Sequence, residues 1–117
     1  MITIASIRAI SEEGVEWTSQ EVQKCVSGIL RWEEIERVEA FKRDLFSYDL
    51  ICLAITVEEG RVLEFDEEDS NWRALTENLA RYLTGAEPLE RWCNAVVFPA
   101  FSMNRQVLYD RQSRIVD

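Results

Sequence analysis

The sequence contains no histidine. Histidine is the usual general base near neutral pH and a frequent zinc ligand. Its absence excludes Ser-His and Cys-His nucleophile pairs and every zinc site that contains histidine. Glycine is scarce as well, and its four positions are too widely spaced for a P-loop or a dinucleotide-binding loop. We therefore expect a protein that is not an enzyme, with no catalytic residue, cofactor or metal ion.

Cysteine and long apolar runs are also limited. The three cysteines are odd in number, far apart and set among apolar neighbours, which predicts buried free thiols in a reducing compartment. The longest apolar run, residues 50–57, is far shorter than the ~20 residues of a membrane-spanning helix. Residues 1–8 lack the positive leader of a signal peptide. We expect a cytoplasmic protein.

Basic residues are fewer than acidic residues in this sequence. The chain has 22 acidic and 13 basic residues, which give a net charge of −9. Nucleic acids and anionic membranes attract basic surfaces, so this balance argues against both as partners and leaves room for a basic protein. The 117 residues, 47% of them hydrophobic, fit a single packed domain over residues 1–117.

The first third of the chain predicts strands. Residues 2–10 are rich in β-branched side chains, and the loop Ser11–Gly14 separates them from a second such run, Val15–Thr18. Glycine adopts a left-handed conformation without steric cost, so this arrangement is typical of a hairpin. Residues 22–30 predict a further strand.

Residues 31–46 fit two different structures. One is an amphipathic helix, because apolar residues recur there at helical spacing: Trp32, Ile35, Val38, Phe41 and Leu45. The other is a tight turn at residues 32–35 that leads into a strand over residues 36–43. Local propensity favours the helix, whereas a family resemblance described below favours the strand, which we adopt.

The middle of the chain contains the clearest elements. Leu50–Val57 and Arg61–Phe65 predict two strands joined by a glycine turn. Near residues 71–84 the sequence predicts one amphipathic helix that Ser70 or Asn71 would cap. Its apolar stripe consists of Trp72, Leu75, Leu79 and Tyr82.

The C-terminal segment predicts a β hairpin. Trp92–Phe98 and Gln106–Arg111 read as β-rich runs separated by a turn at residues 102–105. Residues 92–111 would therefore form a C-terminal strand pair or an interaction tail.

Carboxylate side chains are the remaining candidates for acid–base catalysis or metal binding. Glu33-Glu34 and Glu58-Glu59 are candidate acid–base pairs, but such a pair needs two distinct environments in a cleft, and adjacent glutamates in turns are usually solvated. Four positions of a calcium loop are matched by Asp66, Glu68, Ser70 and Glu77. Asn71, however, stands where that loop requires glycine. Neither pattern predicts a site.

Charge clusters supply the candidate partner-binding residues. The acidic segment 58–69 would meet a basic protein. The locally basic tail, residues 105–114, has the composition of a contact patch, or of a surface that meets the acidic segment of a second copy. The candidates are Glu58, Glu59, Asp66, Glu67, Glu68, Asp69, Phe101 and Arg105.

One pattern carries a resemblance to a known family. Within residues 29–38 the order is apolar-x-Trp-x-x-Ile-x-x-Val, followed by a hairpin with a Glu-Gly turn and an amphipathic helix. Residues 28–83 thereby resemble bacterial pleckstrin-homology-like (PH-like) domains, and the tail is similar to that of small bacterial proteins of unknown function. The resemblance implies an α+β, mainly β fold: a bent antiparallel sheet or partial barrel with one helix packed across an open side.

The family's best-known ligand does not carry over. Lipid-binding members present basic residues in the loop between the first two strands, whereas the loop here, Ser11–Gly14, carries two glutamates. We therefore expect a non-catalytic protein-interaction domain, in one version an acidic inhibitor or immunity-type protein that binds a basic partner. The alternatives are a small-ligand-binding or carboxylate-dependent enzymatic domain, and a homo-oligomer assembled through the C-terminal strands.

Overall fold

The computed structural model describes residues 2–98 and 103–112, and over these ranges the chain forms eight strands and two α-helices. The strands are β1 Ile2–Ile4, β2 Ser6–Ile10, β3 Gly14–Glu21, β4 Lys24–Arg31, β5 Ile35–Asp44, β6 Asp49–Val57, β7 Val62–Asp66 and β8 Gln106–Asp110. The helices are α1 Trp72–Tyr82 and α2 Leu89–Val97, and two short 3-10 turns are η1 Trp32–Glu34 and η2 Glu58–Gly60.

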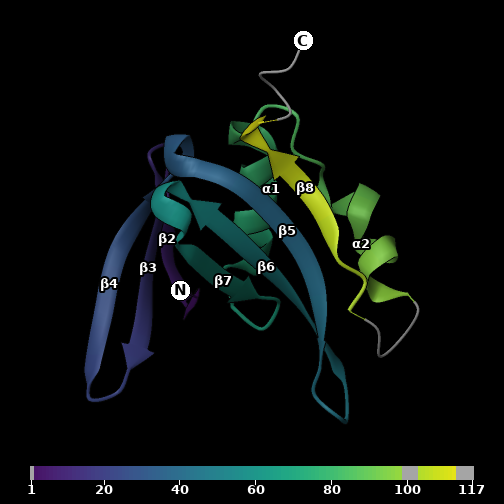
Figure 1. Ribbon diagram of the computed structural model, residues 1–117, viewed down its shortest axis with the longest axis horizontal. Helices are drawn as coiled ribbons and strands as arrows, with labels where there is room; N and C mark the ends of the chain where they lie inside the picture. Colours follow the sequence, from purple (N-terminus) through teal and green to yellow (C-terminus); the bar gives the residue numbers. More distant parts are fainter. Residues whose placement is uncertain (1, 99–102, 113–117) are drawn as a thin grey trace.

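Two sheets form the body of the molecule (Figure 1). The five-stranded sheet has the order β1-β7-β6-β5-β8, and the three-stranded sheet has the order β2-β3-β4. A sharp change of direction at Ala5, whose N–H bonds to the carbonyl of Glu64, divides the predicted first strand between the two sheets. The α+β, mainly β prediction is confirmed, but the sheets do not close into a barrel, and β1 pairs with β7 in parallel.

Residues 31–46 form a turn and a strand, as adopted above. The helical spacing of the apolar residues has a structural cause. A register shift between Ile35 and Arg37 allows Ile35 and Val38 to face the main core together, three residues apart. Phe41 then belongs to a small cluster with Leu50 and Cys52, separate from the main core.

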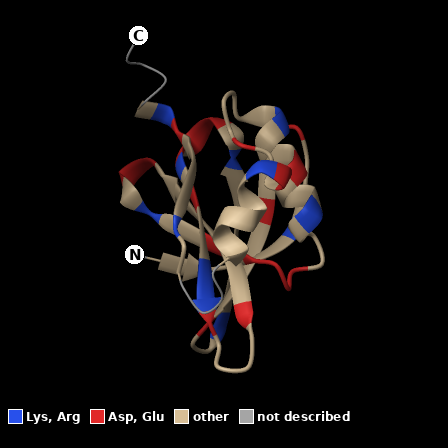
Figure 2. Ribbon diagram, turned by 90° about the vertical axis from the view of Figure 1, so that its right-hand side faces the viewer, with Lys and Arg blue, Asp and Glu red and all other residues tan. Residues whose placement is uncertain are grey.

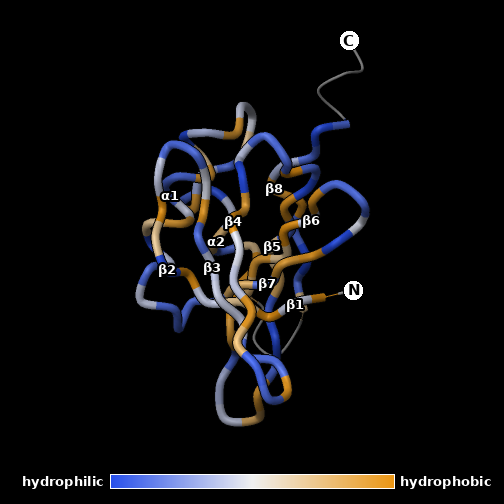
Figure 3. The backbone as a smooth tube through the Cα atoms, turned by 90° about the vertical axis from the view of Figure 1, so that its left-hand side faces the viewer, coloured by the Kyte–Doolittle hydropathy of each residue, from blue (hydrophilic) through white to orange (hydrophobic). Residues whose placement is uncertain are grey.

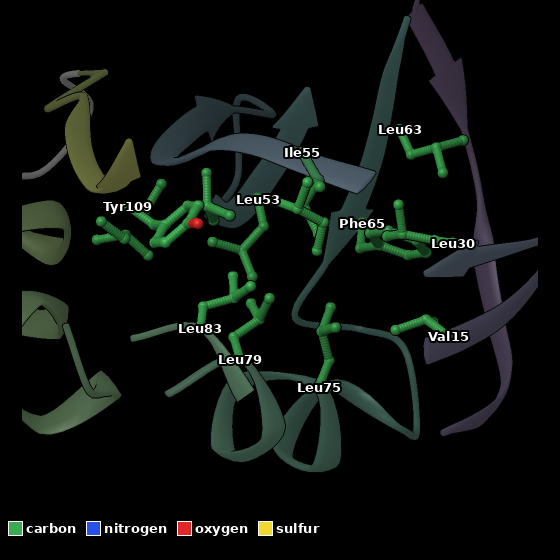
Figure 4. Close-up of a cluster of buried hydrophobic side chains, with 14 of the residues drawn as sticks. Val15, Leu30, Leu53, Ile55, Leu63, Phe65, Leu75, Leu79, Leu83 and Tyr109 are labelled. Carbon is green, nitrogen blue, oxygen red and sulfur yellow. The ribbon is translucent and has the colours of Figure 1, made fainter. Parts of the chain in front are cut away.

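The main core lies between both sheets and α1 (Figure 4). Leu75 and Leu79 project from α1 toward Leu53 of β6 and Phe65 of β7. The predicted helix is thus confirmed. Its predicted cap is not made: the Asn71 side chain accepts no helix N–H, and its amide group donates to the carbonyl of Ile7.

The predicted C-terminal β hairpin is wrong. Residues 89–97 form helix α2, and β8 alone remains as a strand, paired with β5. Valines at the end of this segment gave it a strand-like composition, but Trp92 and Val96, four residues apart, are both buried on one helical face. Pro88 directly precedes the helix, a position where its missing N–H costs nothing.

The three cysteines are free and lie in different environments. Cys52 is buried, and burial raises the pKa of its thiol to about 12. Cys93 is half-buried, whereas Cys25 is exposed on β4, so the prediction of three buried thiols is wrong for Cys25. Within the described ranges, neither helix is long and apolar enough to cross a membrane.

Candidate functional site

Strand register brings three Glu-Glu pairs to one end of the molecule. Arg31 of β4 is paired with Gly14 of β3, so η1 begins beside the β2–β3 turn. Ile35 of β5 is paired with Val57 of β6, so η1 and η2 are neighbours, as the blue and teal turns in Figure 1 show. We call the resulting group the acidic rim: Glu12, Glu13, Glu33, Glu34, Glu58 and Glu59.

Gly14 makes this approach possible. A Cβ atom at this position would lie 2.0 Å from the carbonyl oxygen of Leu30, so only glycine fits at the start of β3. The turn before it is closed by two backbone hydrogen bonds between Ser11 and Gly14. The loop that carries Glu12 and Glu13 is therefore fixed on both sides.

An aromatic wall stands behind the rim. A hollow of about 580 Å³ lies here, lined by rim residues and by Trp32, Tyr82 and Tyr109. The rings of Trp32 and Tyr82 stack with their centroids 5.1 Å apart, and the indole N–H of Trp32 donates to the carbonyl of Ser11 at 2.9 Å. These contacts hold the wall rigidly between η1 and the end of α1.

Two arginines lie among the rim carboxylates. Arg31 is 3.9 Å from Glu13 and 3.8 Å from Glu34. Arg111 is 3.7 Å from Glu58 and also donates to the backbone carbonyl of Glu33. Six carboxylates against two guanidinium groups leave four negative charges in excess, on side chains that are mostly exposed.

The predicted acidic segment is divided between two ends of β7. Glu58 and Glu59 belong to the rim, whereas residues 66–69 follow the other end of the strand. There Asp69 has a structural role, because its carboxylate accepts the backbone N–H of Ile7 at 2.7 Å and that of Asn71 at 2.9 Å. The segment 58–69 is thus not one binding surface.

The neighbours of Asp69 also make internal contacts. The carboxylate of Glu67 accepts the N–H of Ile51 at 3.0 Å, and that of Glu68 accepts the hydroxyl of Tyr48 at 3.2 Å. Asp66 accepts the N–H of Glu68 within its own turn. Among the described residues, no group of three histidine, cysteine or acidic side chains is placed to hold a metal ion.

Arg105 lies away from the rim, on the face of the five-stranded sheet opposite the main core. Its guanidinium is 2.5 Å from Glu39 and 5.0 Å from the ring centroid of Phe41. Burial alone would raise the pKa of Glu39, but hydrogen bonds from Arg105 and Arg37 outweigh it and hold that pKa below its usual value. Phe101, the other tail residue predicted to bind, lies outside the described residues.

A second hollow of about 460 Å³ lies on the same open face. Its charged side chains are matched: Arg43 is 2.6 Å from Glu64, and Glu39 contacts both Arg37 and Arg105. Seen from the side of α2 and β8, acidic and basic segments alternate along the ribbon (Figure 2). This hollow therefore offers no excess charge of the kind found at the rim.

Two of the three rim pairs were missed as partner-binding residues. In the sequence, Glu12-Glu13 indicates only a loop unsuited to lipid, and Glu33-Glu34 only a candidate acid–base pair. The usable signal is that these three Glu-Glu pairs fall in turns, but Glu67-Glu68 also does, and the convergence of the three follows from register. Scans of protein-family models, of curated proteins and of solved structures each returned no match to this chain.

Proposed function

We propose that this protein is a non-catalytic, cytoplasmic interaction domain that binds a basic protein through the acidic rim, in the manner of an inhibitor or immunity-type protein. The observation that carries the proposal is the convergence of Glu12-Glu13, Glu33-Glu34 and Glu58-Glu59 at one end of the molecule, where Glu12, Glu13 and Glu33 line an aromatic-walled hollow. Excess charge on one end of a molecule steers an oppositely charged partner and speeds its association.

The hollow supplies a place for an anchoring side chain. Cationic side chains bind over aromatic rings, and the chain already shows this geometry nearby, where Arg81 lies 5.5 Å from the ring centroid of Tyr82. Because Trp32 and Arg81 already lie against the ring of Tyr82, a partner's arginine or lysine would enter the hollow at the ring edges and contact the carboxylates of the rim. Arg31 and Arg111 hold those carboxylates in position before the partner arrives.

The test measures the affinity of a fluorescein-labelled octa-arginine peptide by fluorescence anisotropy. One variant replaces all six rim glutamates with glutamine. Its matched control replaces six exposed glutamates elsewhere, and so has the same net charge: Glu16, Glu21, Glu68, Glu77, Glu87 and Glu90. We expect the rim variant to bind about tenfold more weakly than the control variant, since several surface ion pairs of modest strength are lost together. Equal weakening in both variants would contradict the proposal.

A small-ligand site is the second candidate, favoured by the volume of the hollow and by its mixture of carboxylates and aromatic rings. Free arginine distinguishes the two in the same experiment. If a single arginine competes at the concentration at which the octa-arginine peptide does, the hollow is a ligand site. If competition needs the peptide, the rim as a whole is the binding surface.

A further inference from the structure

The two sheets have four edges, and three of them are protected. β1 is only three residues long. The β2 edge is covered where Asp69 and Asn71 bond to the N–H and the carbonyl of Ile7. The β8 edge is covered by the N–H of Glu87, which donates to the carbonyl of Leu108 at 3.1 Å. Unprotected edges pair readily with other chains, and short strands and covering loops are the usual defences.

β4 has none of these defences. It is eight residues long and pairs with β3 without a register shift, whereas β2, β5 and β8 all take part in pairings that contain one. It contains no proline and no charge between Lys24 and Arg31. In the part of the chain that the structure describes, no strand or loop backbone bonds to its outer side.

The position of β4 in the fold leaves it accessible. It forms one margin of the molecule in Figure 1, and it lies in front of the fold when the molecule is viewed from that margin (Figure 3). Five of its eight residues are exposed, two are half-buried, and only Leu30 is buried. An added strand would therefore meet no described part of the chain.

Gly28 makes room for an aromatic ring on the core-facing side of this edge. The indole of Trp17 lies across β4 at Gly28, so that a Cβ atom there would be 2.9 Å from the ring. Val26 and Leu30 lie on the same side of β4 as Gly28, since side chains alternate along a strand. A side chain from an added strand, placed beside Gly28, would extend the apolar surface over the edge of Trp17.

We propose that β4 pairs with β4 of a second copy of this chain, antiparallel and centred on Ser27. In this register Val26 lies beside Gly28 of the other copy, next to the edge of Trp17, at both symmetry-related positions, and Lys24 lies opposite Leu30 rather than another cation. A two-fold pairing uses the one open edge of each copy. Assembly therefore stops at a dimer and does not continue into a fibre.

The dimer responds to salt in the opposite sense from the rim. Each copy carries a net charge of −9, so the two bodies repel one another, and screening strengthens their association. Binding of a basic partner at the rim weakens with salt. Failure of one proposal is thereby distinguishable from failure of the other.

The test is sedimentation velocity of the whole chain over a range of concentrations. We expect a monomer–dimer equilibrium that tightens between about 50 and 300 mM salt. The S27K variant places two lysines opposite each other at the axis, and we expect dimerisation about tenfold weaker. The S6K variant is the matched control: Ser6 is exposed on the same face of the same sheet, at the protected β2 edge, and its dimerisation should be unchanged.

A cross-link checks the register independently of charge. In a C25S background, S27C should form a disulfide-linked dimer on mild oxidation, and S6C should not. A wild-type chain that stays monomeric throughout, equal effects of S27K and S6K, or equal cross-linking of both cysteine variants would overturn the proposal.

Discussion

Single buried polar residues hold distant parts of this small fold together. Lys42 is 3% exposed, and its ammonium group contacts Asp49 at 3.1 Å and the carbonyl of Val97 at 2.5 Å. That carbonyl belongs to the last turn of α2, where backbone acceptors have no partner within the helix. One side chain therefore links β5, the start of β6 and the C-terminal end of α2.

Replacing Lys42 with alanine should destabilise the protein by about 3 kcal/mol, because the largely buried carboxylate of Asp49 and the carbonyl of Val97 both lose the ammonium group. The measurement is urea unfolding followed by tryptophan fluorescence. Lys24→Ala, at an exposed position of β4, is the control and should change the free energy of unfolding by about 0.5 kcal/mol or less. Similar losses in both variants would show that Lys42 makes no special link.

At the scale of elements, most of the accurate sequence predictions had local causes, whereas the strand over residues 36–43 was adopted against local propensity. The hairpin of β6 and β7 follows from a β-rich apolar run and a glycine turn, and the helix α1 follows from an apolar stripe. The error over residues 92–98 arose because a run of valines suggested a strand, whereas burial of Trp92 and Val96 depends on packing against the sheets. The acidic rim could not be predicted either, since pairing of Ile35 with Val57 joins segments that no local pattern connects.

Asp69 was predicted to bind a partner, but its carboxylate bonds to the edge strand β2 and has a structural role. Asp69→Ala should destabilise the protein by about 1.5–3 kcal/mol, because the N–H groups of Ile7 and Asn71 both lose their acceptor. It should leave octa-arginine affinity within about twofold of the wild type. Asp66→Ala, whose carboxylate bonds only within an exposed turn, is the control for stability. A large loss of affinity without loss of stability would restore Asp69 as a binding residue.

At the scale of the whole molecule, charge and edges are distributed unevenly. The acidic excess gathers at the end where η1, η2 and the β2–β3 turn meet, while the open face of the five-stranded sheet has matched charges. The unprotected backbone lies along β4. Under the two proposals above, the acidic rim would bind a basic protein and the β4 edge would bind a second copy.

The most direct test of the account is where a basic ligand binds. The measurement is the change in backbone amide shifts of the isotopically labelled chain as octa-arginine is added. We predict that the largest changes fall together in residues 11–14, 32–34 and 58–60, with the indole N–H of Trp32 among them. Changes concentrated in residues 66–69, or spread evenly over the acidic residues, would contradict the claim that three Glu-Glu pairs form one binding surface.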